Sequence, residues 1–227
     1  MRRFTVNHIP AVGDFLHLEP AVSHHLLRVS GIAPSERVEI FDGSGVTAVA
    51  ELCSVEEGVA VLRVIEHRQV GMGVTPIHLM IAQLRANVLD TVLRMATELG
   101  VNEVTVVNAE RCVARGDKRE RWIRIVQAAA GQSGRHSWPV IHPPRAFAEV
   151  LELAPDTVGR ICVPNTDESA LGAGDLRPRC LLIGPEGGWT KAEVDAAIER
   201  DWVPMGLGPT VLRADTAAVA AVVRSLA

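Results

Sequence analysis

The chain has 227 residues and a net charge of −4 at pH 7, and 48% of its residues are hydrophobic. This length suits one large domain or two small ones, and no apolar run approaches the roughly 20 residues that a membrane-spanning helix needs. Residues 1–6 lack the continuous apolar segment of a signal peptide. The four cysteines form no CxxC pair, so nothing indicates a zinc site. We expect a cytoplasmic protein with reduced, buried thiols and neither a metal nor a membrane partner.

Residues 1 to about 70 have the pattern of a β domain. Hydrophobic runs rich in β-branched residues alternate with glycine-containing turns, of which the DGSG turn at 42–45 is the clearest. Hairpins of this kind indicate a small barrel. The predicted strands are Val38–Phe41, Val46–Leu52 and Val59–His67, and one helical piece, Ser23–Val29, precedes them.

The pattern changes around Val70–Val74, and strands then alternate with helices to the end of the chain. Alternation of this sort predicts a parallel sheet covered on both faces, in a second domain over residues 74–227. Gly100 is placed to end the first of these helices, and Leu171–Pro178 resembles a surface loop. The predicted strands are Ile77–Ala82, Glu103–Val107, Arg160–Val163 and Cys180–Ile183; the predicted helices are Val88–Leu99, Arg119–Gln132, Thr190–Arg200 and Thr216–Leu226.

Three segments with turn chemistry follow predicted strands: Val163–Thr166, Gly184–Gly188 and Leu207–Thr216. Ligands of open parallel sheets bind beyond the carboxyl ends of the strands. In the second segment, adjacent glycines allow a backbone to approach a ligand closely, and Thr190 with Glu193 forms a capping box that starts the next helix. A tight turn with no ligand remains the alternative for this segment alone.

Known phosphate-binding motifs do not match these loops. The order of residues from Gly184 to Lys191 is not that of a P-loop, and Gly206-Leu207-Gly208 lacks the third glycine of a dinucleotide fingerprint. We therefore do not expect an NAD-dependent or NTP-dependent enzyme.

The last predicted helix, beginning at Thr216, is apolar on nearly all sides and should be buried, either beneath other elements or in a dimer. Asp215 or Thr216 can cap it. Arg213 places a charge at its start, and the alternatives are a functional cation and a surface salt bridge.

A basic segment lies between Arg111 and Arg135, with seven basic residues against two acidic ones. At helical spacing, Trp122 and Val126 share an apolar face with Ile125 and Ala129, while lysine and arginine run along another. A cationic stripe suits phosphates, and a solvated helix face is the alternative.

Four stretches follow one another along the chain, and a fifth lies near its start: "MATELGVNEVTVVNAERCVAR", "ERWIRIVQAAAGQSGR", "LLIGPEGGWTKAEVDAA", "LGPTVLRADTAAVAAV" and, earlier, "VSHHLLRV…VEIFDGSG". Together they resemble the bacterial 16S rRNA (uracil-N-3)-methyltransferase family of the SPOUT superfamily, over nearly the whole chain. The resemblance implies an α/β protein with an N-terminal PUA-like β-barrel that helps to bind RNA and a C-terminal domain tied in a deep trefoil knot. It also implies a homodimer that methylates N3 of one uridine in small-subunit ribosomal RNA, using S-adenosylmethionine and releasing S-adenosylhomocysteine.

The resemblance assigns the three strand-end segments to the cofactor pocket. The residues implied are Val163, Pro164, Asn165, Ile183, Gly184, Pro185, Glu186, Gly187, Gly188, Leu207, Gly208, Val211, Leu212, Arg213, Ala214, Thr216 and Ala217. We expect Arg213 or Arg135 to face the uracil oxygens, and Asp215 or Glu98 to act as the base or an orienting group. The expected RNA contacts are Arg2, Arg3, Arg28, Arg111, Arg121, Arg124 and Arg135.

The sequence departs from the family pattern in three places. Leu212–Ala217 reads LRADTA where LRTETA is usual, Met95 occupies a common lysine position, and Ser30-Gly31 stands where an arginine is often found. The histidines form no metal or triad pattern, and the adjacent His24 and His25 are expected on the barrel surface or facing RNA. Methylation of another RNA such as tRNA, and a non-catalytic assembly factor, are the other functions that we consider.

Overall fold

A computed structural model describes residues 1–69, 75–152, 156–166 and 177–226. Its contacts divide the chain into two compact units, Met1–Gly73 with Ala130–Trp138, and Val74–Ala129 with Pro139–Ala227. The expected boundary at 70–74 and most of the expected surface loop, 171–176, lie outside the described residues. Residues 130–138 were expected in the second domain but pack with the first unit, because their side chains meet those of the first sheet.

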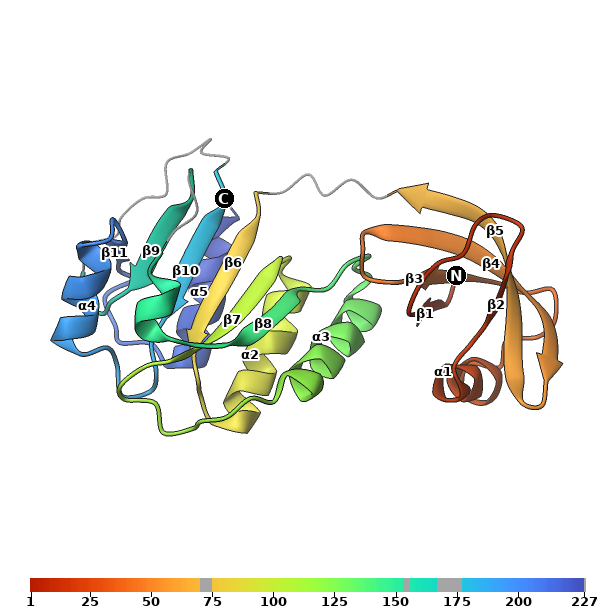
Figure 1. Cartoon of the computed structure of the whole chain (residues 1–227), viewed down its shortest axis with the longest axis horizontal. Coiled ribbons are helices and arrows are strands. Elements are labelled where there is room, and N and C mark those ends of the chain that lie inside the picture. The colour runs from red at the N-terminus through yellow and green to blue at the C-terminus, as the bar shows by residue number, and fades with distance from the viewer. Residues whose placement is uncertain (70–74, 153–155, 167–176, 227) are drawn as a thin grey trace. The chain divides into compact units, whose positions relative to one another are not determined.

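The first unit is built on a five-stranded sheet of order β1-β3-β4-β5-β2 (Figure 1). The long hairpin of β4 and β5 is antiparallel, β3 pairs antiparallel with β4, and β1 pairs parallel with β3. The three predicted strands are confirmed, and the predicted helical piece is an α-helical turn followed by a π-helical one. The bounds are β1 Arg3–Thr5, β2 Phe15–His17, α1 Pro20–His24, η1 His25–Val29, β3 Arg37–Phe41, β4 Val46–Glu56 and β5 Val59–Gln69.

One face of this sheet carries the core of the unit. The alternating residues Val38 and Ile40 of β3 are fully buried with Leu52 and Leu62 of the hairpin, and Leu26 of η1 packs against them. Period-2 alternation in the strands therefore places one apolar face inward, as the sequence pattern predicts.

Gly43, in the predicted turn at 42–45, allows the segment 130–138 to pack closely against the first sheet. Gly43 has φ +83, and a Cβ there would lie 2.3 Å from ring atoms of Trp138. The ring of Trp138 also lies edge-on to Phe41, at 6.1 Å between centroids. These contacts explain why residues 130–138 belong to the first unit.

The second unit is a six-stranded sheet of order β11-β9-β10-β6-β7-β8, and each pairing in it is parallel. The predicted parallel sheet is confirmed. Two of its strands, β8 and β11, were not predicted, and β8 carries Pro143 and Pro144 at the sheet edge, where a missing N–H is tolerated. The strands are β6 Ile77–Ala82, β7 Glu103–Asn108, β8 Val140–Ala146, β9 Val158–Cys162, β10 Arg179–Ile183 and β11 Val203–Met205.

Helices cover both faces of this sheet, as expected. The helices α2 and α5 contact each other, and α5 also contacts β10 and β6. The opposite face carries a buried cluster that includes Met80, Leu182 and Trp202, with side chains of α4 and η2 packed into it. The bounds are α2 Ala86–Glu98, α3 Arg119–Ser133, η2 Phe147–Val150, α4 Lys191–Ile198 and α5 Ala214–Ser225.

The ends of two helices follow local rules. Gly100 follows α2 with φ +100, which confirms its predicted place after the helix. At the end of α5, the buried guanidinium of Arg179 donates to the carbonyl of Ser225 and so satisfies an orphan helix carbonyl. This bond holds the last helix against the start of β10.

The thiols differ from the prediction. Cys162 and Cys180 are buried, but Cys53 is exposed on β4 and Cys112 is half-buried. The expectation that the four thiols are buried is therefore wrong, because Cys53 falls on the solvent side of a two-sided strand. No described helix is both long and apolar enough to cross a membrane.

Candidate functional site

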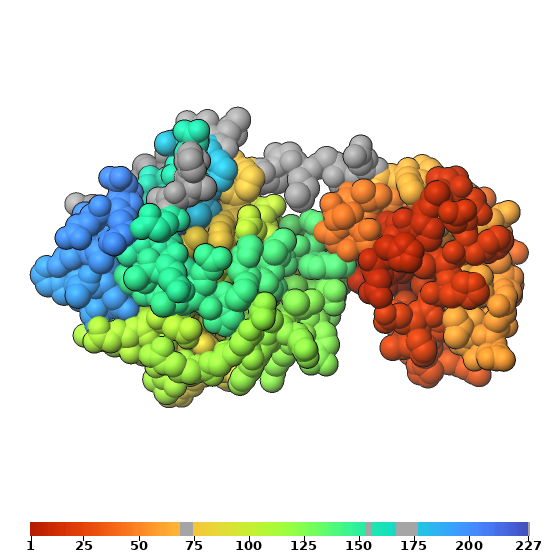
Figure 2. Space-filling model, viewed as in Figure 1, coloured from red at the N-terminus to blue at the C-terminus, as the bar shows by residue number. Residues whose placement is uncertain are grey.

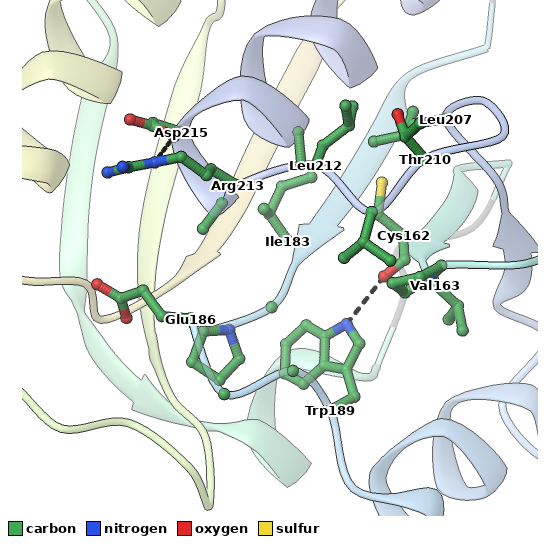
Figure 3. Close-up of a pocket in the computed structure, with 18 of the residues that line it drawn as sticks. Cys162, Val163, Ile183, Glu186, Trp189, Leu207, Thr210, Leu212, Arg213 and Asp215 are labelled. Carbon is green, nitrogen blue, oxygen red and sulfur yellow. Dashed lines mark hydrogen bonds and ion pairs between the residues drawn. The ribbon is translucent and has the colours of Figure 1, made fainter.

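A cavity of about 610 Å³ lies at the carboxyl ends of β9, β10 and β11, as Figure 3 shows. Its walls come from the segments that follow these strands and from one residue at the start of α2. The lining residues are Val88, Cys162, Val163, Pro164, Ile183, Gly184, Pro185, Glu186, Gly187, Gly188, Trp189, Met205, Leu207, Gly208, Thr210, Val211, Leu212, Arg213, Ala214, Asp215 and Ala217.

The glycine-rich wall after β10 is shaped by close packing. A Cβ on Gly184 would lie 3.1 Å from the indole ring of Trp189, and Gly188 has φ +70, a conformation that disfavours other residues. The amide of Gly188 donates to the carbonyl of Pro185 at 2.8 Å, which closes the turn. The two glycines are therefore required by the loop itself, whether or not a ligand is bound.

The helix after this wall begins as predicted. The hydroxyl of Thr190 accepts from the amide of Glu193, and the Glu193 carboxylate accepts from the amide of Thr190 at 2.8 Å, so the capping box is confirmed. The carboxylate of Glu193 is buried and also accepts from the amide of Glu110 at 2.9 Å. Glu193 therefore links the start of α4 to the loop after β7.

Trp189 joins two walls of the cavity. Its indole N–H donates to the carbonyl of Cys162 at 3.1 Å (Figure 3). Its ring also packs on Phe147, at 5.1 Å between centroids. Cys162 ends β9, whereas Trp189 follows β10. A single side chain thus fixes the spacing of the two strand ends, and burial raises the pKa of the Cys162 thiol to about 12, which keeps it protonated.

Arg111 supports the glycine-rich wall from outside. Its Nη1 donates to the carbonyl of Gly187 at 3.0 Å and to that of Trp189 at 3.4 Å. A Cβ on Gly187 would lie 3.2 Å from the Cβ of Arg111, so glycine permits this close approach. Arg111, which was expected to contact RNA, therefore donates both of these hydrogen bonds within the protein.

Charged groups gather on one side of the cavity. The side chain of Arg213 is 78% exposed, and its Nε lies 3.4 Å from the carboxylate of Asp215. Glu186 stands on the same side in Figure 3, and its carboxylate accepts from the amide of Arg85 at 3.3 Å. The expected capping of the last helix by Asp215 or Thr216 is wrong, because α5 already begins at Ala214 and Asp215 accepts from its neighbouring amide instead.

Most of the predicted cofactor residues line this one cavity, and Asp215 lines it with them. Asn165 and Thr216 do not line it, and both side chains are exposed. Glu98 ends α2, whereas Val88 near the start of that helix lines the cavity, and a rise of 1.5 Å per residue separates them by about 15 Å. Arg135 belongs to the first unit and is not among the lining residues.

Five lining residues were not predicted: Val88, Cys162, Trp189, Met205 and Thr210. Trp189 could have been found, because it separates the glycine pair from the capping threonine and has no apolar run around it. Val88 comes from a distant helix, and no local pattern points to it.

The predicted RNA contacts have varied surroundings. Arg2 and Arg28 are exposed, but Arg3 forms an ion pair with Glu39 at 2.9 Å and lies 4.9 Å from the centre of the Phe41 ring. Arg3 also donates to the carbonyl of Arg135 at 3.2 Å. Arg3 therefore contributes to the structure of the first unit. Burial lowers the pKa of Arg135.

Residues 111–124 of the basic segment are mostly exposed, and Figure 2 shows this part of the second unit in yellow-green. The apolar face of α3 is confirmed, since Trp122 and Val126 are buried. On the other face Arg121 pairs with Asp90, and Arg124 is exposed. These cations are accessible to phosphates.

Comparison with known proteins agrees with this arrangement. Residues 73–225 match the family model of the RNA methyltransferase domain. Ribosomal RNA small subunit methyltransferase E of Synechocystis is 33% identical over 211 residues, which cover 88% of this chain and 69% of that protein. The protein of the same name from Bacillus subtilis is 30% identical over 214 residues, covering 86% of this chain and 82% of that protein.

Among solved structures, the ribosomal RNA small subunit methyltransferase E of Neisseria gonorrhoeae, bound to S-adenosyl methionine, has a TM-score of 0.90 at 29% identity, covering 98% of this chain and 95% of that chain. The matched family region contains the whole cavity and the helix that follows it. The chain belongs to the RNA methyltransferase family, among the ribosomal RNA small subunit methyltransferase E proteins.

Proposed function

We propose that this protein methylates N3 of a uridine in 16S ribosomal RNA of the small subunit, using S-adenosylmethionine. The observation that carries the proposal is the cavity at the carboxyl ends of β9, β10 and β11, inside the region that matches the RNA methyltransferase domain. A relative of the same fold binds S-adenosyl methionine. We further propose that the protein acts in the cytoplasm, where small subunits are assembled.

The residues of the cavity fit this cofactor. Apolar side chains such as Ile183, Met205 and Leu212 suit an adenine ring, and the backbone of the glycine-rich wall offers amides and carbonyls. The charged lining groups are the carboxylates of Glu186 and Asp215 and one guanidinium, Arg213. A net negative lining suits a ligand with sulfonium and ammonium charges and one carboxylate, and it disfavours a nucleoside phosphate.

We further propose the SPOUT architecture for the second unit, with a deep trefoil knot, and a PUA-like barrel for the first. Support for the knot is that the chain lines the cavity after β10, lines it again between Leu207 and Ala217, and then packs α5 against β10 and β6. Support for an RNA-binding barrel is the exposure of Arg2 and Arg28 on the first unit.

A homodimer is proposed from the last helix and the segment before it. Val211 is 70% exposed, Val223 48% and Leu226 39%, although α5 also has a fully packed side. Exposed apolar side chains at the carboxyl end of α5 and in the segment before it favour burial by a second copy. Sedimentation at micromolar concentration measures the assembly, and a monomer there would contradict this part of the proposal.

When bound, S-adenosylmethionine supplies a methyl group on a positively charged sulfur. The protein has to orient the uracil, remove its N3 proton and stabilise the negative charge on the oxygens O2 and O4. Of the two cations expected for this task, Arg213 lies at the cavity, and its exposed guanidinium can reach a base above it. Asp215, at 3.4 Å, orients that guanidinium or accepts the proton.

The base has to leave its stack to reach this side of the cavity. Arg28, Arg121 and Arg124 are exposed and positively charged, which suits contacts with RNA phosphates. Alanine at each position should weaken RNA binding and lower its salt dependence.

The first experiment is a methylation assay. Small ribosomal subunits from cells that lack the enzyme are incubated with the protein and labelled S-adenosylmethionine, and the product is located by mass spectrometry. A methyl group on uridine N3 is the expected product. Cofactor binding with no transfer to subunits or to naked ribosomal RNA would contradict the substrate and favour another RNA, such as tRNA. Absence of a thermal shift with S-adenosylmethionine would contradict the cofactor itself.

A matched pair of arginine variants tests the role of Arg213. Arg213→Ala should lower kcat by about 100-fold, the usual cost of one group that stabilises developing charge, and should lower cofactor affinity far less. The control is Arg200→Ala. Arg200 follows α4, forms an ion pair with Glu152 at 3.4 Å and does not line the cavity, so its loss should leave kcat unchanged. Equal rates for the two variants would remove Arg213 from the mechanism.

A further inference from the structure

Three polar side chains meet at the amino ends of adjacent strands. His78 is the second residue of β6, Glu103 begins β7, and His142 is the third residue of β8. Figure 1 shows these strands side by side. In the ladder His78 pairs with Glu103, and Thr105 pairs with His142, so the three side chains point from the same face of the sheet.

The geometry of this group is compact. One ring nitrogen or carboxylate oxygen from each residue lies within 4.8 Å of those of the other two. Glu103 Oε2 is 2.6 Å from His142 Nε2, and the two imidazole rings are 5.3 Å apart between centroids. All three residues are half-buried, so an ion from solvent can reach them.

We propose that His78, Glu103 and His142 bind a zinc ion. Two imidazoles and one carboxylate form a common three-residue ligand set for this metal, with water as the fourth ligand. Bonds of 2.0–2.2 Å place tetrahedral ligand atoms about 3.3–3.5 Å apart, and side-chain rotations at the sheet edge bring the three atoms to that spacing. Thr105 Oγ1, 2.8 Å from His78 Nε2, orients one ligand from outside.

An ion pair between Glu103 and His142 alone would not require His78 to approach. The presence of a third ligating side chain beside this pair distinguishes a ligand set from an ion pair. Arg145, three residues after His142 on β8, is a positive charge near this group. Arg145→Ala should therefore tighten zinc binding.

The position of the site indicates a structural role. Strand β8 forms the edge of the sheet, its ladder with β7 is irregular between Thr105 and Val107, and Pro143 and Pro144 follow His142 without amide donors. A metal bound by His142 would attach this weakly paired strand to β6 and β7. Cys180 pairs with His78, and Ile183 of the cavity lies three residues further along β10, a separation of about 10 Å along the strands. The zinc site is therefore separate from the cavity.

The test uses the full chain freed of metal by a chelator, titrated with zinc and followed by calorimetry and by thermal unfolding. We expect one zinc ion per chain, and a rise of about 5–10 °C in Tm at 100 times the Kd. Loss of a residue that only hydrogen-bonds to a metal ligand weakens binding by roughly 10- to 100-fold. Glu103→Gln and His142→Ala each alter a ligand itself and should weaken zinc binding by more than that. The double variant His24→Ala/His25→Ala removes an adjacent exposed pair and should bind zinc as the natural chain does.

Cobalt provides a second readout that does not depend on the variants. Cobalt bound to this site should give visible bands of a tetrahedral ion without near-ultraviolet thiolate bands, because the ligand set contains no sulfur. The proposal is overturned if the natural chain binds no zinc at micromolar concentration. It is equally overturned if binding survives His142→Ala and is lost in the His24/His25 double variant, which would mean adventitious surface binding only.

Discussion

Arg111→Ala separates two roles for one cation. The sequence assigns Arg111 to RNA, whereas in the structure its Nη1 donates to the carbonyls of Gly187 and Trp189, at 3.0 and 3.4 Å. If the second role dominates, the variant loses the external support of the glycine-rich wall. The cavity then has to be ordered by the cofactor when it binds, and cofactor affinity falls.

The magnitude follows from the kind of bond that is lost. A hydrogen bond from a charged donor contributes about 1.5–3 kcal/mol, and the exposure of Arg111 reduces this to about 1–1.5 kcal/mol. One of the two bonds is long, so we take about 1 kcal/mol, which corresponds to a rise of about 5-fold in the Kd for S-adenosylmethionine.

Calorimetry with S-adenosylmethionine measures this change, and filter binding with RNA at several salt concentrations measures the other role. Arg119→Ala is the control, because Arg119 is exposed in the same basic segment and pairs with Asp117 at 2.7 Å. An unchanged cofactor Kd with a smaller salt slope would refute the supporting role and restore the assignment to RNA.

Three further variants or reagents test the structure elsewhere. Trp189→Phe keeps the ring but leaves the Cys162 carbonyl without its donor at 3.1 Å, and should cost about 1–3 kcal/mol of the free energy of unfolding, measured in urea. A disulfide reagent should modify the exposed thiol of Cys53 in the native protein but reach Cys162, whose pKa burial raises to about 12, only after unfolding. Gly43→Ala places a Cβ 2.3 Å from a tryptophan ring and should destabilise the first unit by about 2–4 kcal/mol. Gly58→Ala, with a similar φ of +85 and open space, should cost only about 1–2 kcal/mol; equal costs would mean that the ring moves aside.

Regular elements of the second unit were predictable because their signals are local. The strand Ile77–Ala82 was predicted with the bounds that it has, and the capping box at Thr190 placed the start of α4. Strand β8 was missed because it lies at the sheet edge and contains two consecutive prolines, which break the apolar pattern of a buried strand.

The candidate site was predictable in outline for a similar reason. Glycines and prolines directly after apolar strands mark the carboxyl edge of a parallel sheet, and three such segments do meet at one cavity. Glu98, expected as a base or orienting group, does not line the cavity. Helical periodicity gives the face on which a residue lies, but not which end of the helix reaches the cavity.

The sequence alone determined that this chain contains an α/β domain whose site is built from loops. Its signals are hydrophobic periodicity and turn residues, which depend on only a few neighbouring positions. Which distant side chains meet was decided only by the tertiary structure. Arg111 reaches Gly187, Trp189 reaches Cys162, and His78 meets His142 because the order and register of parallel strands bring them together. Strand order depends on packing across the whole sheet, and no local pattern in the chain encodes it.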